Sequence, residues 1–229
     1  MAGNHNHCNN EASHDHACGN VREEVIAHFP YAVFSVALGL IGAALLDCLS
    51  SGAKQPEVVK HSMHTLFHTF HFMHIVFAAT GGMLTYFRYS KNILKGILTC
   101  SVSTIVFCML SDILLPYTMG TLFGVPMKLH ICFVSEFYNV IPFLLIGTFN
   151  GWILAQHEKH LHNFYSLWSH FTHIFVSASA AIIYTISHGF TNWASHMGMI
   201  FLLLVIAVVI PCTLSDVVIP LFFAKDNKC

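Results

Sequence analysis

Charged side chains are scarce in this chain of 229 residues. They make up 9% of the sequence, while hydrophobic residues make up 55% and the mean hydropathy is +0.63. Soluble domains carry roughly a quarter charged residues, so the composition excludes that class and indicates an integral membrane protein. The formal net charge is −1, and no basic excess points to a nucleic acid as a partner. We therefore expect the protein to be surrounded by membrane lipid.

The amino end lacks the pattern of a cleaved signal peptide. Residues 1–28 are polar and do not contain a basic segment followed by an apolar one. We expect this region to be a disordered, cytoplasmic tail that is rich in histidine and cysteine.

Six mostly apolar runs are long enough to cross a membrane, since a spanning helix needs about 20 such residues. They predict six transmembrane helices near residues 29–49, 63–87, 96–118, 131–155, 166–187 and 198–223. Seven lysines and arginines fall on the side of the termini and three on the opposite side. Because basic residues favour the cytoplasmic side, both termini are predicted to be cytoplasmic.

The second half of the sequence repeats features of the first. HFMHIVFAATGGMLTY, from His71, aligns with HFTHIFVSASAAIIYT, from His170, and CMLSDILLPY aligns with CTLSDVVIPL. A duplicated unit of three spans must enter the membrane from the opposite face, an arrangement known from transporters, whose shared site lies near the midplane. The predicted fold is therefore an all-α membrane protein whose six transmembrane helices form two inverted three-helix repeats, over residues 29–122 and 129–224.

Histidine is the polar residue in surplus, with 18 copies. The stretch HSMHTLFHTFHFMH at 61–74 carries five of them. On a helix, His64, His68 and His71 share one face with His74 at its margin, and His170 and His173 share a face in the second repeat. Ionisable groups inside a membrane face the other helices or a cavity, so we expect both stripes to point inward.

Two repeated aspartates accompany these histidines. Asp112 and Asp216 lie near helix ends, where the helix dipole disfavours negative charge, so a bound cation or a protonated imidazole is expected nearby. They can ligate a metal, orient an imidazole or accept a proton, and imidazole is a common ligand of transition metals. For any single histidine, a structural hydrogen bond between helices is the alternative. The predicted metal site contains His64, His68, His71, His74, His170, His173, Asp112 and Asp216.

Weaker signals lie outside these stripes. Two His-x-His units, each followed by a cysteine, favour exchangeable metal capture by the tail, although a plain disordered tail is the alternative; the residues are His5, His7, Cys8, His14, His16 and Cys18. Secondary candidates are Asp47, Glu136, His157, His160 and His162. The cysteines in or near the spans are interpreted as small apolar packing residues, namely Cys48, Cys100, Cys108, Cys132 and Cys212.

Three functions fit these patterns. The favoured one is a transporter, not an enzyme, for a divalent transition-metal cation such as Zn, Ni, Co, Mn or Fe, with proton coupling and homo-oligomerisation left open. The second is a membrane redox protein that binds haem between paired histidines. The third is a di-iron histidine-box oxygenase, which the absence of any adjacent His-His pair disfavours.

Overall fold

The computed structural model describes residues 21–50, 56–157, 162–190 and 192–225. Within these ranges every regular element is a helix, so the predicted all-α class is confirmed. The candidates of the amino-terminal tail and His160 lie outside the described residues.

The first half of the chain forms three successive long helical segments. The third is interrupted by one wide, π-helical turn, η2. The elements are α1 (Val21–Ser50), α2 (Pro56–Tyr89), α3 (Ile93–Met109), η2 (Leu110–Leu114) and α4 (Leu115–Leu122).

The second half begins with one short extra helix and then follows the same order. Its last long segment is again interrupted by a π-helical turn, η4. The elements are α5 (Cys132–Ser135), α6 (Phe137–His157), α7 (His162–Ser187), the 3₁₀ turn η3 (Trp193–His196), α8 (Met197–Thr213), η4 (Leu214–Val218) and α9 (Ile219–Lys225).

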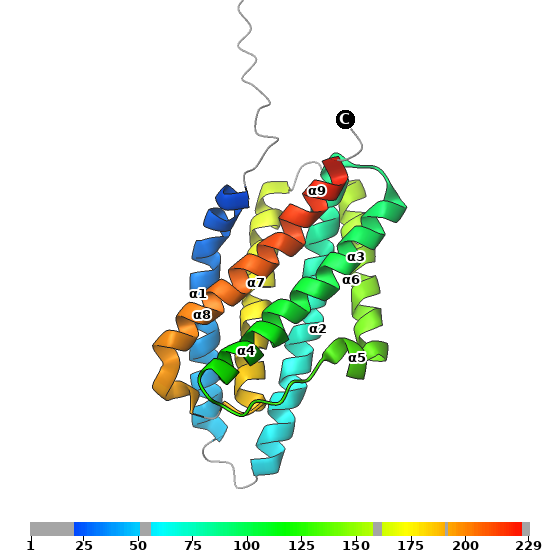
Figure 1. Cartoon of the computed structure of the whole chain (residues 1–229). Coiled ribbons are helices and arrows are strands. Elements are labelled where there is room, and N and C mark those ends of the chain that lie inside the picture. Colours follow the sequence, from blue (N-terminus) through cyan, green and yellow to red (C-terminus); the bar gives the residue numbers. More distant parts are fainter. Residues whose placement is uncertain (1–20, 51–55, 158–161, 191, 226–229) are drawn as a thin grey trace, which may run out of the picture.

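Helices α2 and α7 form the centre of the bundle. Helix α2 packs against α3, α6 and α7, while α7 packs also against α1 and α8. The two central helices run in opposite directions, α2 towards the top of Figure 1 and α7 towards the bottom. Helix α1 begins and α9 ends at the top, which we call the upper end of the bundle. Helices α4 and α5 lie at the opposite, lower end.

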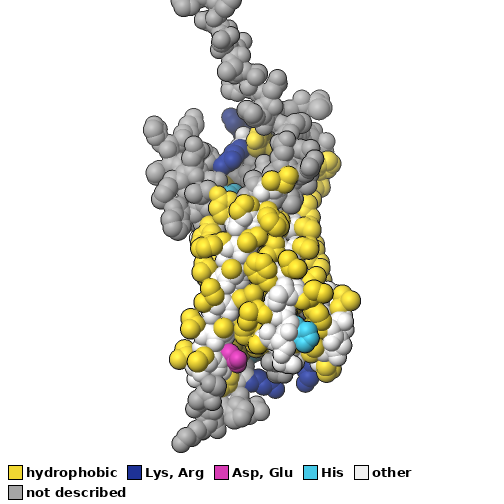
Figure 2. Space-filling model, turned by 90° about the vertical axis from the view of Figure 1, so that its left-hand side faces the viewer, with side chains coloured by type: hydrophobic (Ala, Val, Ile, Leu, Met, Phe, Trp, Pro, Cys, Tyr) yellow, Lys and Arg dark blue, Asp and Glu magenta, His cyan; other side chains and the backbone are white. Residues whose placement is uncertain are grey.

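Five helical segments among the described residues are long and apolar enough to cross a membrane. Figure 2 shows a broad belt of hydrophobic side chains on one face, with lysines and arginines towards its two ends. The predicted span at 63–87 lies in α2, which is not one of the five because its histidines lower its hydropathy. The five are His28–Ser50, Ile93–Leu122, Phe137–Gln156, His170–Ser187 and Trp193–Ala224.

Helix α1 begins at Val21, within the predicted disordered tail, and α2 begins at Pro56, earlier than the predicted residue 63. Two other boundaries differ from the prediction for local reasons. The span predicted at 131–155 is broken at Glu136, whose φ of −121° and ψ of 28° are not helical, so α6 begins one residue later. The span predicted at 96–118 begins earlier, because the Asn92 side chain accepts a hydrogen bond from the Lys95 N–H (3.1 Å) and caps α3.

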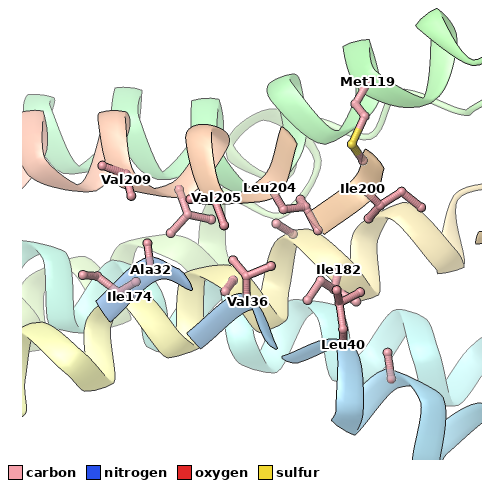
Figure 3. Close-up of a cluster of buried hydrophobic side chains, with 14 of the residues drawn as sticks. Ala32, Val36, Leu40, Met119, Ile174, Ile182, Ile200, Leu204, Val205 and Val209 are labelled. Atoms are coloured by element: carbon pink, nitrogen blue, oxygen red, sulfur yellow. The ribbon is translucent and has the colours of Figure 1, made fainter. Parts of the chain in front are cut away.

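An apolar core joins α1, α7 and α8. Figure 3 shows Ala32 and Val36 of α1 meeting Ile174 of α7 and Val205 and Val209 of α8. All five side chains are buried. This packing holds α7 against α1 on the side away from α2, and so fixes the position of one of the two central helices.

Helices α2 and α6 approach each other closely through a glycine. A Cβ atom at Gly147 would lie 2.6 Å from the Val76 carbonyl oxygen. Thr80 reinforces this contact, because its hydroxyl donates to the Gly147 carbonyl (3.1 Å). Small residues that let backbones touch are a common basis of helix association in membranes.

We expect Gly147→Ala to lower the thermal unfolding temperature in detergent, because the added methyl group pushes α6 away from α2. Gly42→Ala is the matched control, since a Cβ there meets nothing within 4 Å. Alanine favours a helix over glycine by roughly 0.8–1 kcal/mol, so the control should be neutral or stabilised. Equal unfolding temperatures for the two variants would contradict the close approach.

Candidate metal centre

The two repeated aspartates sit in the two π-helical turns. The Leu115 N–H donates a hydrogen bond to the Leu110 carbonyl in η2, and the Ile219 N–H donates one to the Leu214 carbonyl in η4. Proline four residues after each aspartate has no N–H to continue the regular helical pattern, which favours the wide turn. Single π turns occur frequently at functional sites. The shared Leu-Ser-Asp-x-x-x-Pro sequence therefore accounts for the same local geometry in both halves.

Asp112 is fully buried and holds two histidines of α2. Its Oδ2 accepts hydrogen bonds from Nδ1 of His71 (2.9 Å) and Nδ1 of His74 (2.7 Å). Its Oδ1 accepts from the hydroxyls of Ser111 (2.7 Å) and Ser177 (2.9 Å). Both oxygens are thus occupied by donors, which stabilises an ionised carboxylate inside the bundle.

Asp216 repeats this arrangement with fewer partners. Its Oδ2 accepts from Nδ1 of His173, while Nδ1 of His170 lies farther away, at 3.9 Å. Its Oδ1 has no hydrogen-bond partner among the described residues, and neither has the buried Ser215 hydroxyl. Gly81 leaves room for this carboxylate, because a Cβ there would lie 2.9 Å from Oδ2.

The two halves meet where His74 faces His173. Their Nε2 atoms are 2.7 Å apart, and both residues are 1% exposed. Each ring donates its Nδ1–H to an aspartate, so each neutral ring presents a lone pair at Nε2. Two lone pairs at hydrogen-bond distance repel each other. A proton or a metal ion between them removes this repulsion.

Two cysteines complete this contact. The Sγ atoms of Cys108 and Cys212 lie 3.7 Å and 3.8 Å from Nε2 of His74, and both residues are buried. They occupy equivalent positions in CMLSD and CTLSD, before each π turn. We refer to His74, His173, Cys108 and Cys212 as the central cluster.

Three potential metal ligands converge here, and a fourth lies beside them. His74, His173 and Cys212 offer ligand atoms that all lie within 4.8 Å of one another. Cys108 lies outside this group of three, although its Sγ is 3.7 Å from Nε2 of His74. Two imidazoles and two thiolates suit a tetrahedral ion such as zinc. Carboxylates that accept from the remaining ring nitrogen fix the tautomer and orientation of metal-binding histidines. The aspartates take this orienting position here.

The predicted histidine stripe of α2 is divided between two places. His71 and His74 lie in the buried centre, whereas His64 and His68 meet His130, from the loop after α4, nearer the lower end. A pocket of about 630 Å³ opens there, between Lys60, His64, Lys128 and His188. Burial and the neighbouring imidazoles lower the pKa of His188 to about 4, so this ring is neutral at pH 7.

On the other side of the central cluster, His170 leads towards the upper end. Its side chain is 27% exposed, and its ring lies edge-on to that of His28 in α1, with centroids 5.0 Å apart. His71 and His170 are equivalent in the sequence repeat, yet one is buried on the lower side and the other is partly open on the upper side. Imidazoles therefore flank the centre in both directions.

Sequence reasoning misses two residues of the central cluster. It interprets Cys108 and Cys212 as packing residues, although the repeated Cys-x-Leu-Ser-Asp pattern already pairs them. The two predicted aspartates, Asp112 and Asp216, do lie at the centre of the bundle, where they accept hydrogen bonds from imidazoles.

Two of the secondary candidates, Asp47 and Glu136, take no part in the central cluster. Asp47 is exposed near the end of α1, and Glu136 is partly exposed, where its carboxylate accepts from Asn139 (2.6 Å). The side chains of His157 and His162 lie outside the described part of the chain.

No protein-family model, curated protein or solved structure matches this chain. The site is therefore interpreted from its own chemistry.

We expect Asp112→Leu to lower the free energy of unfolding by on the order of 1–3 kcal/mol, because it leaves two buried Nδ1–H donors without an acceptor. Asp47→Leu removes an exposed carboxylate of the same kind and serves as the control. Denaturant titration in detergent, followed by circular dichroism, measures both variants. The hydrogen-bond network is not important for stability if both variants unfold at the same denaturant concentration.

Proposed function

We propose that the protein is a membrane transporter of a divalent transition-metal cation, and that the ion passes through the central cluster. The observation that carries this proposal is the contact between His74 and His173, whose Nε2 atoms lie 2.7 Å apart while both Nδ1 atoms are held by aspartates. A cation between the rings satisfies both lone pairs at once. The flanking cysteines supply two further ligands.

Zinc is the cation that fits the ligands best. In tetrahedral zinc sites, metal–nitrogen distances of about 2.0–2.1 Å and metal–sulfur distances of about 2.3 Å place two nitrogens about 3.3 Å apart and nitrogen and sulfur about 3.5 Å apart. The two sulfurs lie 3.7 Å and 3.8 Å from His74 Nε2, close to the nitrogen–sulfur separation of such a site. To bind one ion with all four ligands, the two nitrogens must separate slightly and the Cys108 side chain must move towards the other three. Thiolates disfavour manganese, which prefers oxygen ligands.

Transport is supported by the position of the cluster between two related halves. We infer that six helices cross the membrane as two inverted repeats, with α2 as the crossing that composition alone does not identify. The opposite directions of α2 and α7 agree with this arrangement (Figure 1). Inverted repeats place the substrate site between the halves, where rocking exposes it to each side in turn. His71 and His170 then line equivalent approaches from opposite sides.

The upper end is proposed to be cytoplasmic. It carries Arg88, Lys91 and Lys95 next to the start of α3 and, among the described residues, more basic residues than the lower end. The amino-terminal tail, with its histidines and cysteines, would then capture the ion on this side. The imidazoles on both sides of the central cluster can also accept protons, so a proton gradient is proposed as the driving force.

Neither the haem nor the di-iron alternative is favoured. Haem would have to lie between its two axial histidines, but the facing nitrogens of His74 and His173 are only a hydrogen bond apart. The histidine-box di-iron alternative is disfavoured by the sequence, which has no adjacent His-His pair.

We expect the purified protein, stripped of metal and then titrated, to bind zinc at the central cluster and to carry zinc into proteoliposomes that contain a fluorescent chelator. Cys212→Ser and His173→Ala should each abolish this flux, because each removes a ligand. His196→Ala, an exposed histidine outside the cluster, should retain it. A Soret band in the purified protein would favour the haem alternative. Flux that survives both cluster variants would contradict the proposed function.

Gly81 provides a test of the orienting role of Asp216. We expect Gly81→Ala to weaken zinc binding about 10–100-fold, the usual effect of disturbing a group that orients a metal-binding histidine. Gly42→Ala adds the same methyl group in open space and should leave the Kd unchanged. Competition with a chromophoric chelator measures both. Identical Kd values would mean that the position of Asp216 does not influence the ligands.

A further inference from the structure

Three imidazoles meet at the lower end of the bundle, away from the central cluster. His64 and His68 come from the first half of α2 and His130 from the loop between α4 and α5. Each offers a ring nitrogen, and these atoms all lie within 4.8 Å of one another. All three side chains are partly buried, and together they form what we call the mouth cluster.

Hydrogen bonds orient two of these rings. Nδ1 of His68 donates to the His64 carbonyl (2.9 Å), so the neutral ring presents its Nε2 lone pair to Nε2 of His130, 3.3 Å away. Tyr184 holds the loop, because its hydroxyl donates to the Lys128 carbonyl (3.2 Å) and accepts from the His130 N–H (3.3 Å). The mouth cluster is therefore built by contacts from α2, α7 and the loop.

The surroundings make the mouth cluster accessible. The pocket of about 630 Å³ is lined by His64 and His130, so an ion can reach these two rings from outside. Glu136 lies close enough to interact electrostatically with His130 and His68, and it offsets part of the positive charge of Lys60 and Lys128. The two lysines weaken the attraction for a cation, which favours rapid exchange over tight retention.

The mouth cluster connects to the centre along one helix. His68 is followed by His71 and His74 on the same stretch of α2, and the ring of His71 stacks on Phe67, with centroids 5.6 Å apart. Both of these side chains are buried. Phe67 and His71 thus separate the open pocket from the central cluster.

We propose that His64, His68 and His130 form a second metal site, which binds a divalent transition-metal cation through three imidazole nitrogens and water. Its ligand set contains no sulfur, so it is chemically distinct from the central cluster. The inference that a transported ion binds here on the lower side rests on the proposed transport function. The inference that the three histidines bind a metal ion does not depend on transport.

Cobalt(II) separates the two sites, because only a site with thiolate ligands gives an intense near-ultraviolet charge-transfer band. Metal-free protein in detergent is titrated with cobalt(II), and both the stoichiometry and this band are recorded. We expect wild-type protein to bind two ions, one with the band. His130→Ala should bind one ion and keep the band, whereas His196→Ala, at the same end of the bundle, should match the wild type. The double variant Cys108→Ser, Cys212→Ser should bind one ion without the band.

The outcomes distinguish the two proposals. Two ions bound by His130→Ala, or none bound by the double cysteine variant, would overturn the mouth cluster and leave the central cluster standing. Wild-type protein that binds one ion without the band, and loses it in His130→Ala, would support the mouth cluster and contradict the central one. His68→Ala repeats the test should His130→Ala fail to fold, and it is expected to lose the same ion.

Discussion

The pairing of buried carboxylates with imidazole Nδ1 atoms is the interaction on which the rest of the site depends. Asp112 accepts from His74 and Asp216 from His173, and these bonds decide which nitrogen of each ring carries its hydrogen. Both rings then direct lone pairs towards the same point. Without the carboxylates, either ring could place its hydrogen on Nε2 and the contact would be an ordinary hydrogen bond. With them, the centre of the bundle requires a positive charge, which is why we propose a cation there.

The two halves share this scaffold but restrain it unequally. Ser177 donates to Asp112, whereas its equivalent in the first half is Ala78, which has no hydroxyl to offer Asp216. Asp216 consequently keeps one oxygen without a partner among the described residues. Fewer donors hold this carboxylate, so it can move with less loss of hydrogen bonding than Asp112. A transporter whose halves move relative to each other would use such a difference to release the ion on one side.

The proposed sites also differ in the ligands that they offer. The mouth cluster presents nitrogen only and lies beside a pocket, while the central cluster adds two buried sulfurs. A zinc ion that passes from the mouth cluster to the central cluster exchanges water ligands for thiolate ligands, which strengthens its binding. Tight binding at the centre would slow release, and protonation of imidazoles or thiols is the general means of weakening it. Proton coupling would follow from the same groups that bind the metal.

The sequence by itself determined the helical class, the membrane setting and the repeated aspartates and histidines, because composition and local periodicity carry that information. It also contained the signal for Cys108 and Cys212 in the repeated motif, although a cysteine in an apolar run resembles a packing residue. Only the tertiary structure decided which members of the α2 stripe act together. His64 and His68 share a helix with His74, but the partners that separate them, His130 and His173, come from distant parts of the chain. Such contacts depend on how helices pack, and periodicity along one helix cannot specify them.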